Sequence, residues 1–382
     1  MKIFRYKTLI IALVYFASMC GPLGAVDGAK LSTMADAVAG PVHRKVPIVF
    51  HNNYDISFFG IEKLHPFDTK KYGKIARHLE QTCDISPEEL QKPEVVTDEQ
   101  LKEVHTLRYL AALKSSSTVA TIAEVPPLRY LPNFLLQRNM LNSMRHATGG
   151  TILGAQLAME NGWAINLGGG YHHAKADGGE GFCFFADIPL AIKKVRETNS
   201  ALKVLVVDLD AHRGNGLAAI LGSDPLTFIF DMYSKNNYPR DYEMCKYIDF
   251  NYPLATNIGD QDYLALLKSG LPKAIETTKP DLIIYNAGSD IFQKDPLGRM
   301  GVTKDGIIER DSFLFSQAIA NSTPILMVLS GGYSAESADI VGTSIENILK
   351  SFKLVGARPQ VALNRQATTG NPKLSKFSKI RK

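Results

Sequence analysis

Three side chains that could bind a metal ion follow one apolar segment of the chain. The segment VVDLDAHRGNG, residues 206–216, carries Asp208, Asp210 and His212 on alternate positions, so all three project to one face of an extended chain. A buried carboxylate without a partner costs several kcal/mol. An aspartate and a histidine two residues apart present one oxygen and one imidazole nitrogen to a common point. With Asp290 as a third ligand, the pattern is typical of a catalytic zinc ion with open positions for water and substrate.

Further groups with acid–base chemistry follow other apolar segments. His172 and His173 come after a GGG turn, and Tyr333 lies in the sequence SGGYS. Histidine titrates near neutral pH, so the pair could accept a proton from water and pass one to a leaving amine. A phenol on a glycine turn could donate to a developing oxyanion. A capping aspartate with a hydrogen-bonded histidine would explain an isolated Asp-x-His pattern, but it does not explain why all these groups follow strands.

The elements that must position these groups alternate along the chain. Apolar segments rich in Val, Ile and Leu predict strands at 47–51, 163–167, 203–209, 226–233, 281–288 and 324–331. Amphipathic segments predict helices at 68–80, 86–90, 97–113, 151–162, 190–199, 217–222, 263–278, 306–321 and 335–352, and a long loop at 115–133. This alternation predicts a single α/β domain over 46–355, with a central, mainly parallel sheet flanked by helices on both faces. Ligands of such sheets bind beyond the carboxyl ends of the strands, where the reactive residues gather.

The two ends of the chain differ from this domain. Of the 382 residues, 45% are hydrophobic and 21% charged, and the net charge of +5 comes from basic residues at both ends, so no nucleic-acid groove is predicted. Residues 1–25 have the layout of a signal peptide, which predicts export, with a cytoplasmic or nuclear location as the alternative. We expect 26–45 to be a linker, 356–382 a disordered basic tail, the cysteines free thiols, and no membrane span once the signal is removed.

Long motifs in this order resemble the zinc-dependent histone deacetylase family, which has the arginase/deacetylase-like fold. The resemblance spans about 46–354 and rests on YDISFFGIEKLHPFDTKKYGK, EVHTLRYLAALK, LPNFLLQRNML, TGGTILGAQLAMENGWAINLGGGYHHA, GGEGFCFFADIPLAIK, VDLDAHRGNG, DLIIYNAGSDI and PILMVLSGGY. It is closest to class IV, the group of the eleventh human histone deacetylase. Asn215, which stands where class I enzymes have an aspartate, is shared by class IV and should make its histidine partner less basic.

The resemblance implies a role for each candidate residue. It makes Asp210, His212 and Asp290 the zinc ligands, with a potassium site at the backbone carbonyls of 208–212. His172 and His173 would lie beside the zinc-bound water, with Asp208 and Asn215 as their partners, and Tyr333 would hold the oxyanion. Gly181 and Phe182 would line the tube for the lysine side chain. The implied substrate is an acyl-lysine of a protein, histone tails included, with acetyl and long-chain acyl groups both open.

Three other functions remain open. An arginase-like enzyme with two metal ions would need more aspartate ligands than this sequence offers. An acetylpolyamine deacetylase is closer, but its eukaryotic members carry an acid in the loop after the third ligand, where this chain has Leu297. The third alternative is a weakly active protein that binds acyl-lysine, and a Tyr333→Phe comparison would separate it from an enzyme.

Overall fold

A seven-stranded parallel sheet lies at the centre of the described part of the chain. The computed structural model describes residues 45–57, 60, 62 and 66–355. The strands pair in the order β1-β2-β7-β6-β3-β4-β5, and every pair is parallel. β3, β6 and β7 are buried along their whole length, as expected of strands covered on both faces. The strands are β1 (Ile48–Val49), β2 (Trp163–Asn166), β3 (Val204–Asp208), β4 (Thr227–Ser234), β5 (Phe250–Leu254), β6 (Leu282–Asn286) and β7 (Ile325–Val328).

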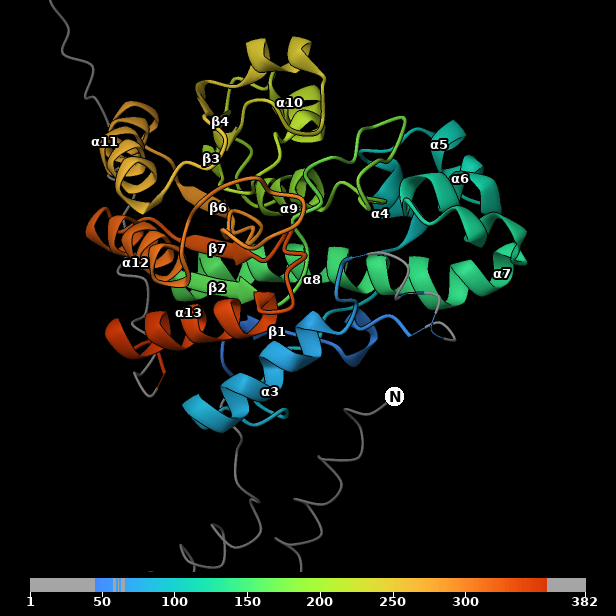
Figure 1. The fold of residues 1–382 in the computed structure, drawn as a ribbon, viewed down its shortest axis with the longest axis horizontal. Coiled ribbons are helices and arrows are strands. Elements are labelled where there is room, and N and C mark those ends of the chain that lie inside the picture. Colours follow the sequence, from blue (N-terminus) through green and yellow to red (C-terminus); the bar gives the residue numbers. More distant parts are fainter. Residues whose placement is uncertain (1–44, 58–59, 61, 63–65, 356–382) are drawn as a thin grey trace, which may run out of the picture. The chain divides into compact units, whose positions relative to one another are not determined.

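Two layers of helices cover the sheet (Figure 1). One layer consists of α8 (Asn142–Asn161), α9 (Asp187–Arg196) and α10 (Asn215–Leu221), and α8 packs against β1, β2, β6 and β7. In the other layer, neighbouring helices pack in the order α3 (Lys71–Cys83), α13 (Ser337–Ser351), α12 (Lys304–Ala320) and α11 (Asp260–Thr278). The described residues belong to one compact unit. The prediction of a single α/β domain with a parallel sheet is therefore confirmed.

The predicted helix at 97–113 is wrong, because the chain forms two short helices there. α4 (Asp98–Lys102) ends in a turn, and α5 (Leu107–Ala112) begins after it. The Thr106 side chain accepts a hydrogen bond from the backbone N–H of Tyr109, 3.2 Å away, and so caps a new helix. The hydrophobic pattern continues across the turn, which is why the sequence suggested one helix.

The predicted loop at 115–133 is also wrong, since it contains α6 (Ser116–Ile122) and η3 (Pro126–Tyr130). The Ser115 side chain caps α6. Residues 86–90, predicted as a helix, form a turn instead. The sequence also missed β5, an edge strand that contains Pro253 and pairs with β4. The remaining short elements are η1 (Asn52–Tyr54), α7 (Asn133–Leu136), η4 (Gln137–Leu141) and η5 (Tyr242–Tyr247).

Several predictions concern the ends of the chain. The signal at 1–25, the linker at 26–45 apart from Lys45, and the tail at 356–382 lie outside the described residues, so they stay predictions. Within the described ranges, no helix is both long and apolar enough to cross a membrane. Cys83, Cys183 and Cys245 are free thiols, as predicted.

Arg310 in α12 ties together the ends of two central strands. Its guanidinium is fully buried and donates to the backbone carbonyls of Leu209, at 3.1 Å, and Gly288, at 2.7 Å. It also pairs with Asp311 through Nε at 2.7 Å. Leu209 follows β3 and Gly288 follows β6, and each lies just before one of the predicted metal ligands. Arg310 therefore fixes the spacing of the two loops that carry those ligands.

Replacing Arg310 by methionine should lower the free energy of unfolding by about 3 kcal/mol, because it leaves the buried Asp311 carboxylate without its cation. Urea unfolding followed by circular dichroism measures the change. Glu309→Gln on the same helix is the matched control. It removes an exposed pair with Lys268 and should change the stability by less than about 1 kcal/mol. Equal effects of the two substitutions would contradict the proposed role of Arg310.

Candidate active site

The strand order brings four loops to the same edge of the sheet. Asn166, Val328, Asn286 and Asp208 are neighbours across β2, β7, β6 and β3. The loops that follow these four residues contain GGGYHH, SGGYS, AGSD and LDAH respectively. Because strands far apart in the sequence are adjacent in the sheet, the predicted site residues meet at one edge.

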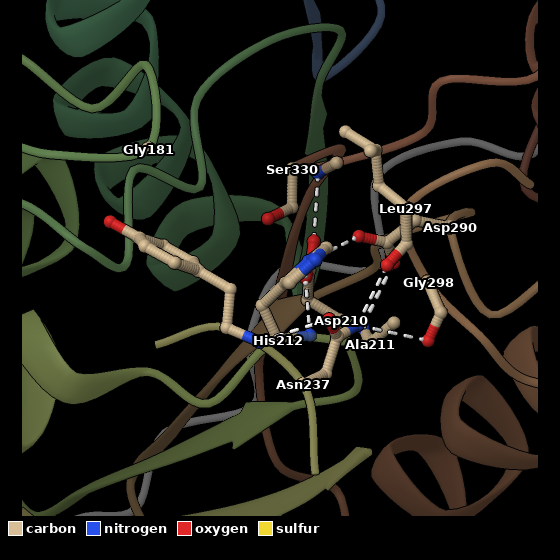
Figure 2. A network of polar contacts seen from close by, with 12 residues as sticks. Gly181, Asp210, Ala211, His212, Asn237, Asp290, Leu297, Gly298 and Ser330 are labelled. Atoms are coloured by element: carbon tan, nitrogen blue, oxygen red, sulfur yellow. Dashed lines mark hydrogen bonds and ion pairs between the residues drawn. The ribbon is translucent and has the colours of Figure 1, made fainter. Parts of the chain in front are cut away.

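Asp210, His212 and Asp290 form a buried group that could hold a metal ion. One ligand atom from each residue lies within 4.8 Å of the others. Nδ1 of His212 lies 2.9 Å from Oδ2 of Asp290 and 3.1 Å from Oδ1 of Asp210 (Figure 2). The backbone N–H of Ala211 donates to Asp290 Oδ1 at 2.8 Å, and that of Gly331 donates to Asp210 Oδ2 at 2.9 Å. The backbone N–H of His212 donates to the other Asp210 oxygen, Oδ1, at 2.9 Å. The backbone thus holds both oxygens of Asp210 and one oxygen of Asp290, whose Oδ2 faces His212.

The electrostatics of this group fit a bound cation. Burial and the neighbouring Asp210 carboxylate raise the pKa of Asp290 to about 7. Burial alone would lower the pKa of His212, but the hydrogen bonds and charges of the two carboxylates raise it well above its usual value. Without a metal ion, protons on this group thus compensate the buried carboxylates, and a bound cation would compensate them instead. Its oxygen and nitrogen donors suit zinc.

His172 lies between the metal-capable group and Asp208. Its Nδ1 is 2.8 Å from Oδ2 of Asp208, and its Nε2 is 3.6 Å from Oδ1 of Asp210. The Asn286 side chain donates to the other Asp208 oxygen at 2.9 Å, which fixes the carboxylate. Burial alone would lower the pKa of His172, but the charges of Asp208 and Asp210 raise it to about 9. His172 therefore retains a proton at neutral pH.

His173 has the opposite electrostatic environment. Its ring centroid lies 4.0 Å from that of His172, and its Nδ1 lies 2.9 Å from Oδ1 of Asn215. Burial, followed by the charges of His172 and His212, lowers the pKa of His173 well below 6.5, and the Asn215 hydrogen bond offsets this only in part. The pKa values of the two histidines are thus driven apart. At neutral pH His173 is the member of the pair that can accept a proton.

Asp187, which was not predicted as a site residue, holds the loop that carries His172 and His173. Its buried carboxylate accepts the backbone N–H groups of Gly170, at 2.8 Å, and Tyr171, at 2.9 Å. The hydroxyl of Thr151 in α8 donates to the same carboxylate at 2.6 Å. Asp187 follows the apolar sequence FCFFA and starts α9, and an acid in that context was the available signal. It orients the backbone immediately before His172.

Tyr333 is held at the same edge through its backbone. Asp295 Oδ2 accepts the N–H of Tyr333 at 2.7 Å and that of Ser334 at 3.1 Å. The Tyr333 ring centroid lies 6.2 Å from that of His212. Burial, followed by the charges of Asp210 and Asp290, raises the pKa of Tyr333 well above 10. The phenol therefore stays protonated and can act as a hydrogen-bond donor.

A cavity of about 200 Å³ opens onto these groups. The predicted residues Gly181, Phe182 and Leu297 all line it. So do His173, His212 and Tyr333, whereas Asp208, Asp210, Asn215 and Asp290 are buried behind the lining. The other lining residues were not predicted from the sequence; they are Glu124, Asn237, Tyr238, Pro296 and Arg299. The result is a cavity lined in part by aromatic side chains, and it reaches the metal-capable group at His212.

Fold and site together define a metal-dependent hydrolase of the arginase/deacetylase type. The model of the histone deacetylase domain matches residues 65–349, and the chain belongs to this family. The family is zinc-dependent, and the chain is accordingly a hydrolase that acts on amide bonds.

The chain is similar to several known proteins. It is 43% identical to histone deacetylase 2 of Arabidopsis thaliana over 316 residues, which are 83% of this chain and 81% of that protein. It is 27% identical to the acetoin utilization protein AcuC of Staphylococcus aureus strain MRSA252, over 71% and 73% of the two chains. The crystal structure of the HDA15 HD domain shares the fold, with a TM-score of 0.66 at 22% identity over 84% of this chain and 91% of that chain.

Proposed function

We propose that the protein is a zinc-dependent protein lysine deacylase, which hydrolyses N-ε-acyl-lysine to lysine and a carboxylate. The observation that carries this proposal is the arrangement around the cavity. A buried Asp-His-Asp group lies at its floor, and His173 and Tyr333 stand in its wall. An acyl-lysine side chain that enters the cavity would bring its amide to His173, His212 and Tyr333, which line it.

Asp210, His212 and Asp290 would hold the zinc ion. When bound, zinc polarises an amide carbonyl and lowers the pKa of a water molecule. We also propose a potassium site at the backbone carbonyls of Asp208, Asp210 and His212. Its support is Ser234, whose N–H donates to the Ala211 carbonyl at 2.9 Å and whose buried hydroxyl has no hydrogen-bond partner among the described residues.

The protein's own side chains would move the protons. His173, which is neutral at neutral pH, accepts a proton as water attacks the carbonyl carbon. His172, held by Asp208, keeps its proton and adds positive charge beside the metal-capable group, with Nε2 3.6 Å from Asp210. The hydroxyl of Tyr333 donates to the developing oxyanion. As the carbon–nitrogen bond breaks, His173 returns the proton to the lysine nitrogen, and the products are a carboxylate and an amine.

The cavity supports a protein substrate. Gly181 and Phe182 on one side and Leu297 on another would enclose the aliphatic part of an acylated lysine, and histone tails are flexible enough to present one. Asn215 beside His173 supports assignment to class IV, and relatives of that class resemble long-chain deacylases as much as deacetylases. Both acetyl and long-chain acyl groups therefore belong in the test.

A small-molecule amidohydrolase is the second candidate. Glu124 lines the cavity and is an acid suited to the second ammonium of an acetylated polyamine. Leu297 argues against it, because it occupies the loop position where polyamine-selective relatives carry an acid.

Assays on the purified chain should separate these functions. We expect turnover of an acetyl-lysine or a myristoyl-lysine peptide, and loss of that turnover when a zinc chelator is added. The ratio of the two kcat/KM values decides between a deacetylase and a long-chain deacylase. Acetylputrescine is the comparison substrate. A higher kcat/KM for acetylputrescine than for either peptide would favour the small-molecule enzyme.

A further inference from the structure

A chain of hydrogen bonds runs from His173 away from the cavity. Nδ1 of His173 lies 2.9 Å from Oδ1 of Asn215, and Nδ2 of Asn215 donates to Oε1 of Glu180 at 2.6 Å. The Lys175 ammonium lies 3.1 Å from the same Glu180 oxygen and 3.2 Å from Asp241. Glu180 is about one-third exposed. It is a carboxylate two hydrogen bonds away from the proposed proton acceptor.

The charge of Glu180 decides which way the Asn215 amide faces. A side-chain amide has one donor end and one acceptor end, whereas an ionised carboxylate only accepts. The donor end of Asn215 must therefore face Glu180, because the reversed amide would oppose two oxygens at 2.6 Å. The acceptor end then faces His173, so Nδ1 of His173 must carry the hydrogen. Its Nε2 is left with the lone pair that accepts a proton.

We propose that Glu180 is a positioning residue that fixes the tautomer of His173 through Asn215. The catalytic consequence rests on the proposed function, in which His173 is the proton acceptor. In class I enzymes, the aspartate at position 215 places a carboxylate in direct contact with this histidine. In this chain the carboxylate is that of Glu180, and Asn215 lies between it and His173. Glu180 orients the amide of Asn215, and that amide fixes which nitrogen of His173 carries the hydrogen.

The backbone holds Glu180 in place. The N–H of Cys183 donates to the carbonyl of Glu180 at 2.9 Å, which closes a tight turn. The two central residues, Gly181 and Phe182, both have left-handed backbone conformations, with φ of 55° and 63°. Left-handed conformations at both central positions are the signature of a type I′ turn, which is a narrowly defined geometry. The turn that sets Phe182 in the cavity wall therefore also sets Glu180 against Asn215.

This arrangement explains why residue 215 is an asparagine. An aspartate there would place a second carboxylate against Glu180 at hydrogen-bond distance, and the two would repel unless they shared a proton. The identities of residues 180 and 215 are therefore coupled. Asn215→Asp as a single substitution should lower the activity. Adding Glu180→Gln should restore it, because glutamine can donate to the new carboxylate.

The first test is spectroscopic and does not depend on turnover. Two-bond ¹H–¹⁵N spectra of the full-length chain with ¹⁵N-labelled histidine report which ring nitrogen of His173 is protonated, and a His173→Phe sample assigns the signals. We expect Nδ1–H in the wild type, with and without added zinc. The Glu180→Leu variant should show a mixture of tautomers. An unchanged His173 tautomer in that variant would overturn the proposal.

The second test is a double-mutant cycle on kcat and KM. Asn215→Asp should lower kcat about 10-fold, and Asn215→Asp/Glu180→Gln should recover to within about threefold of the wild type. Glu180→Leu should lower kcat about 10-fold with little change in KM, whereas Glu276→Leu at an exposed site in α11 should do neither. Equal effects of Asn215→Asp in the wild-type and Glu180→Gln backgrounds would overturn the coupling. If neither the wild type nor any variant shows turnover, but the His173 tautomer still depends on Glu180, the proposed function is contradicted. The assignment of Glu180 as the residue that fixes this tautomer is then still supported.

Discussion

The Asp290→Asn variant should keep its fold and lose most of its affinity for zinc. Asparagine can still accept the Ala211 N–H through Oδ1, which places its Nδ2 where the second carboxylate oxygen points at His212. A nitrogen that carries two hydrogens has no lone pair to offer a metal ion. Structural zinc sites bind with about 10–16 kcal/mol, so the loss of one of three protein ligands should weaken binding on the order of 10³-fold.

Zinc content and chelator competition measure this loss, and thermal unfolding provides a second readout. Zinc should raise the unfolding temperature of the wild type and leave that of Asp290→Asn unchanged, because a ligand stabilises only the state that binds it. Asp262→Asn, at an exposed position of α11, is the matched control and should behave like the wild type. Zinc affinity equal to that of the wild type in Asp290→Asn would refute the ligand assignment.

The free energy of unfolding of the metal-free Asp290→Asn variant should also depend less on pH than that of the metal-free wild type. Burial and the Asp210 charge raise the pKa of Asp290 to about 7 in the folded chain, above its value of about 4 when unfolded. The folded state therefore binds its proton more tightly, and this carboxyl contributes stability at low pH that is lost as the pH rises through 7. Asparagine removes that loss. Urea unfolding of the two metal-free proteins at pH 5 and pH 8 measures the effect. The free energy of unfolding should decrease less from pH 5 to pH 8 in the variant than in the wild type.

Tyr333→Phe should lower kcat by about 10² to 10³-fold while KM and zinc content stay close to those of the wild type. Asp295 holds residue 333 by its backbone N–H, so phenylalanine keeps the loop in place. What it lacks is the hydroxyl, which the high pKa of Tyr333 keeps protonated and able to donate. Loss of one oxyanion donor has an effect of this size in other hydrolases.

Steady-state kinetics on the better peptide substrate measure the effect, with Tyr130→Phe at an exposed position as the control. Undiminished kcat in Tyr333→Phe would show that another group holds the oxyanion. If the wild type binds acyl-lysine peptide without turnover and Tyr333→Phe leaves that affinity intact, the chain is better described as a weakly active acyl-lysine-binding protein.

The hydrophobic pattern of the sequence was enough to predict the layered architecture and the edge of the sheet at which the reactive residues gather. Apolar segments such as 203–209 and 281–288 leave little choice but buried parallel strands, and all carboxyl ends of parallel strands reach one edge of a sheet. Local hydrogen bonds were harder to anticipate. The cap at Thr106 splits a continuous hydrophobic pattern into two helices, and Pro253 concealed an edge strand.

The contacts between polar groups, in contrast, depend on how the chain folds. The strand order β2-β7-β6-β3 does not follow the chain, and side-chain hydrogen bonds join segments that the sequence does not pair. Asp187 and Asp295 act on backbone N–H groups, which every residue but proline offers, so no residue type in the loops points to them. Glu180 acts through an amide whose orientation depends on both of its neighbours. The sequence supplied the reactive side chains, and the fold determined the hydrogen bonds that orient them.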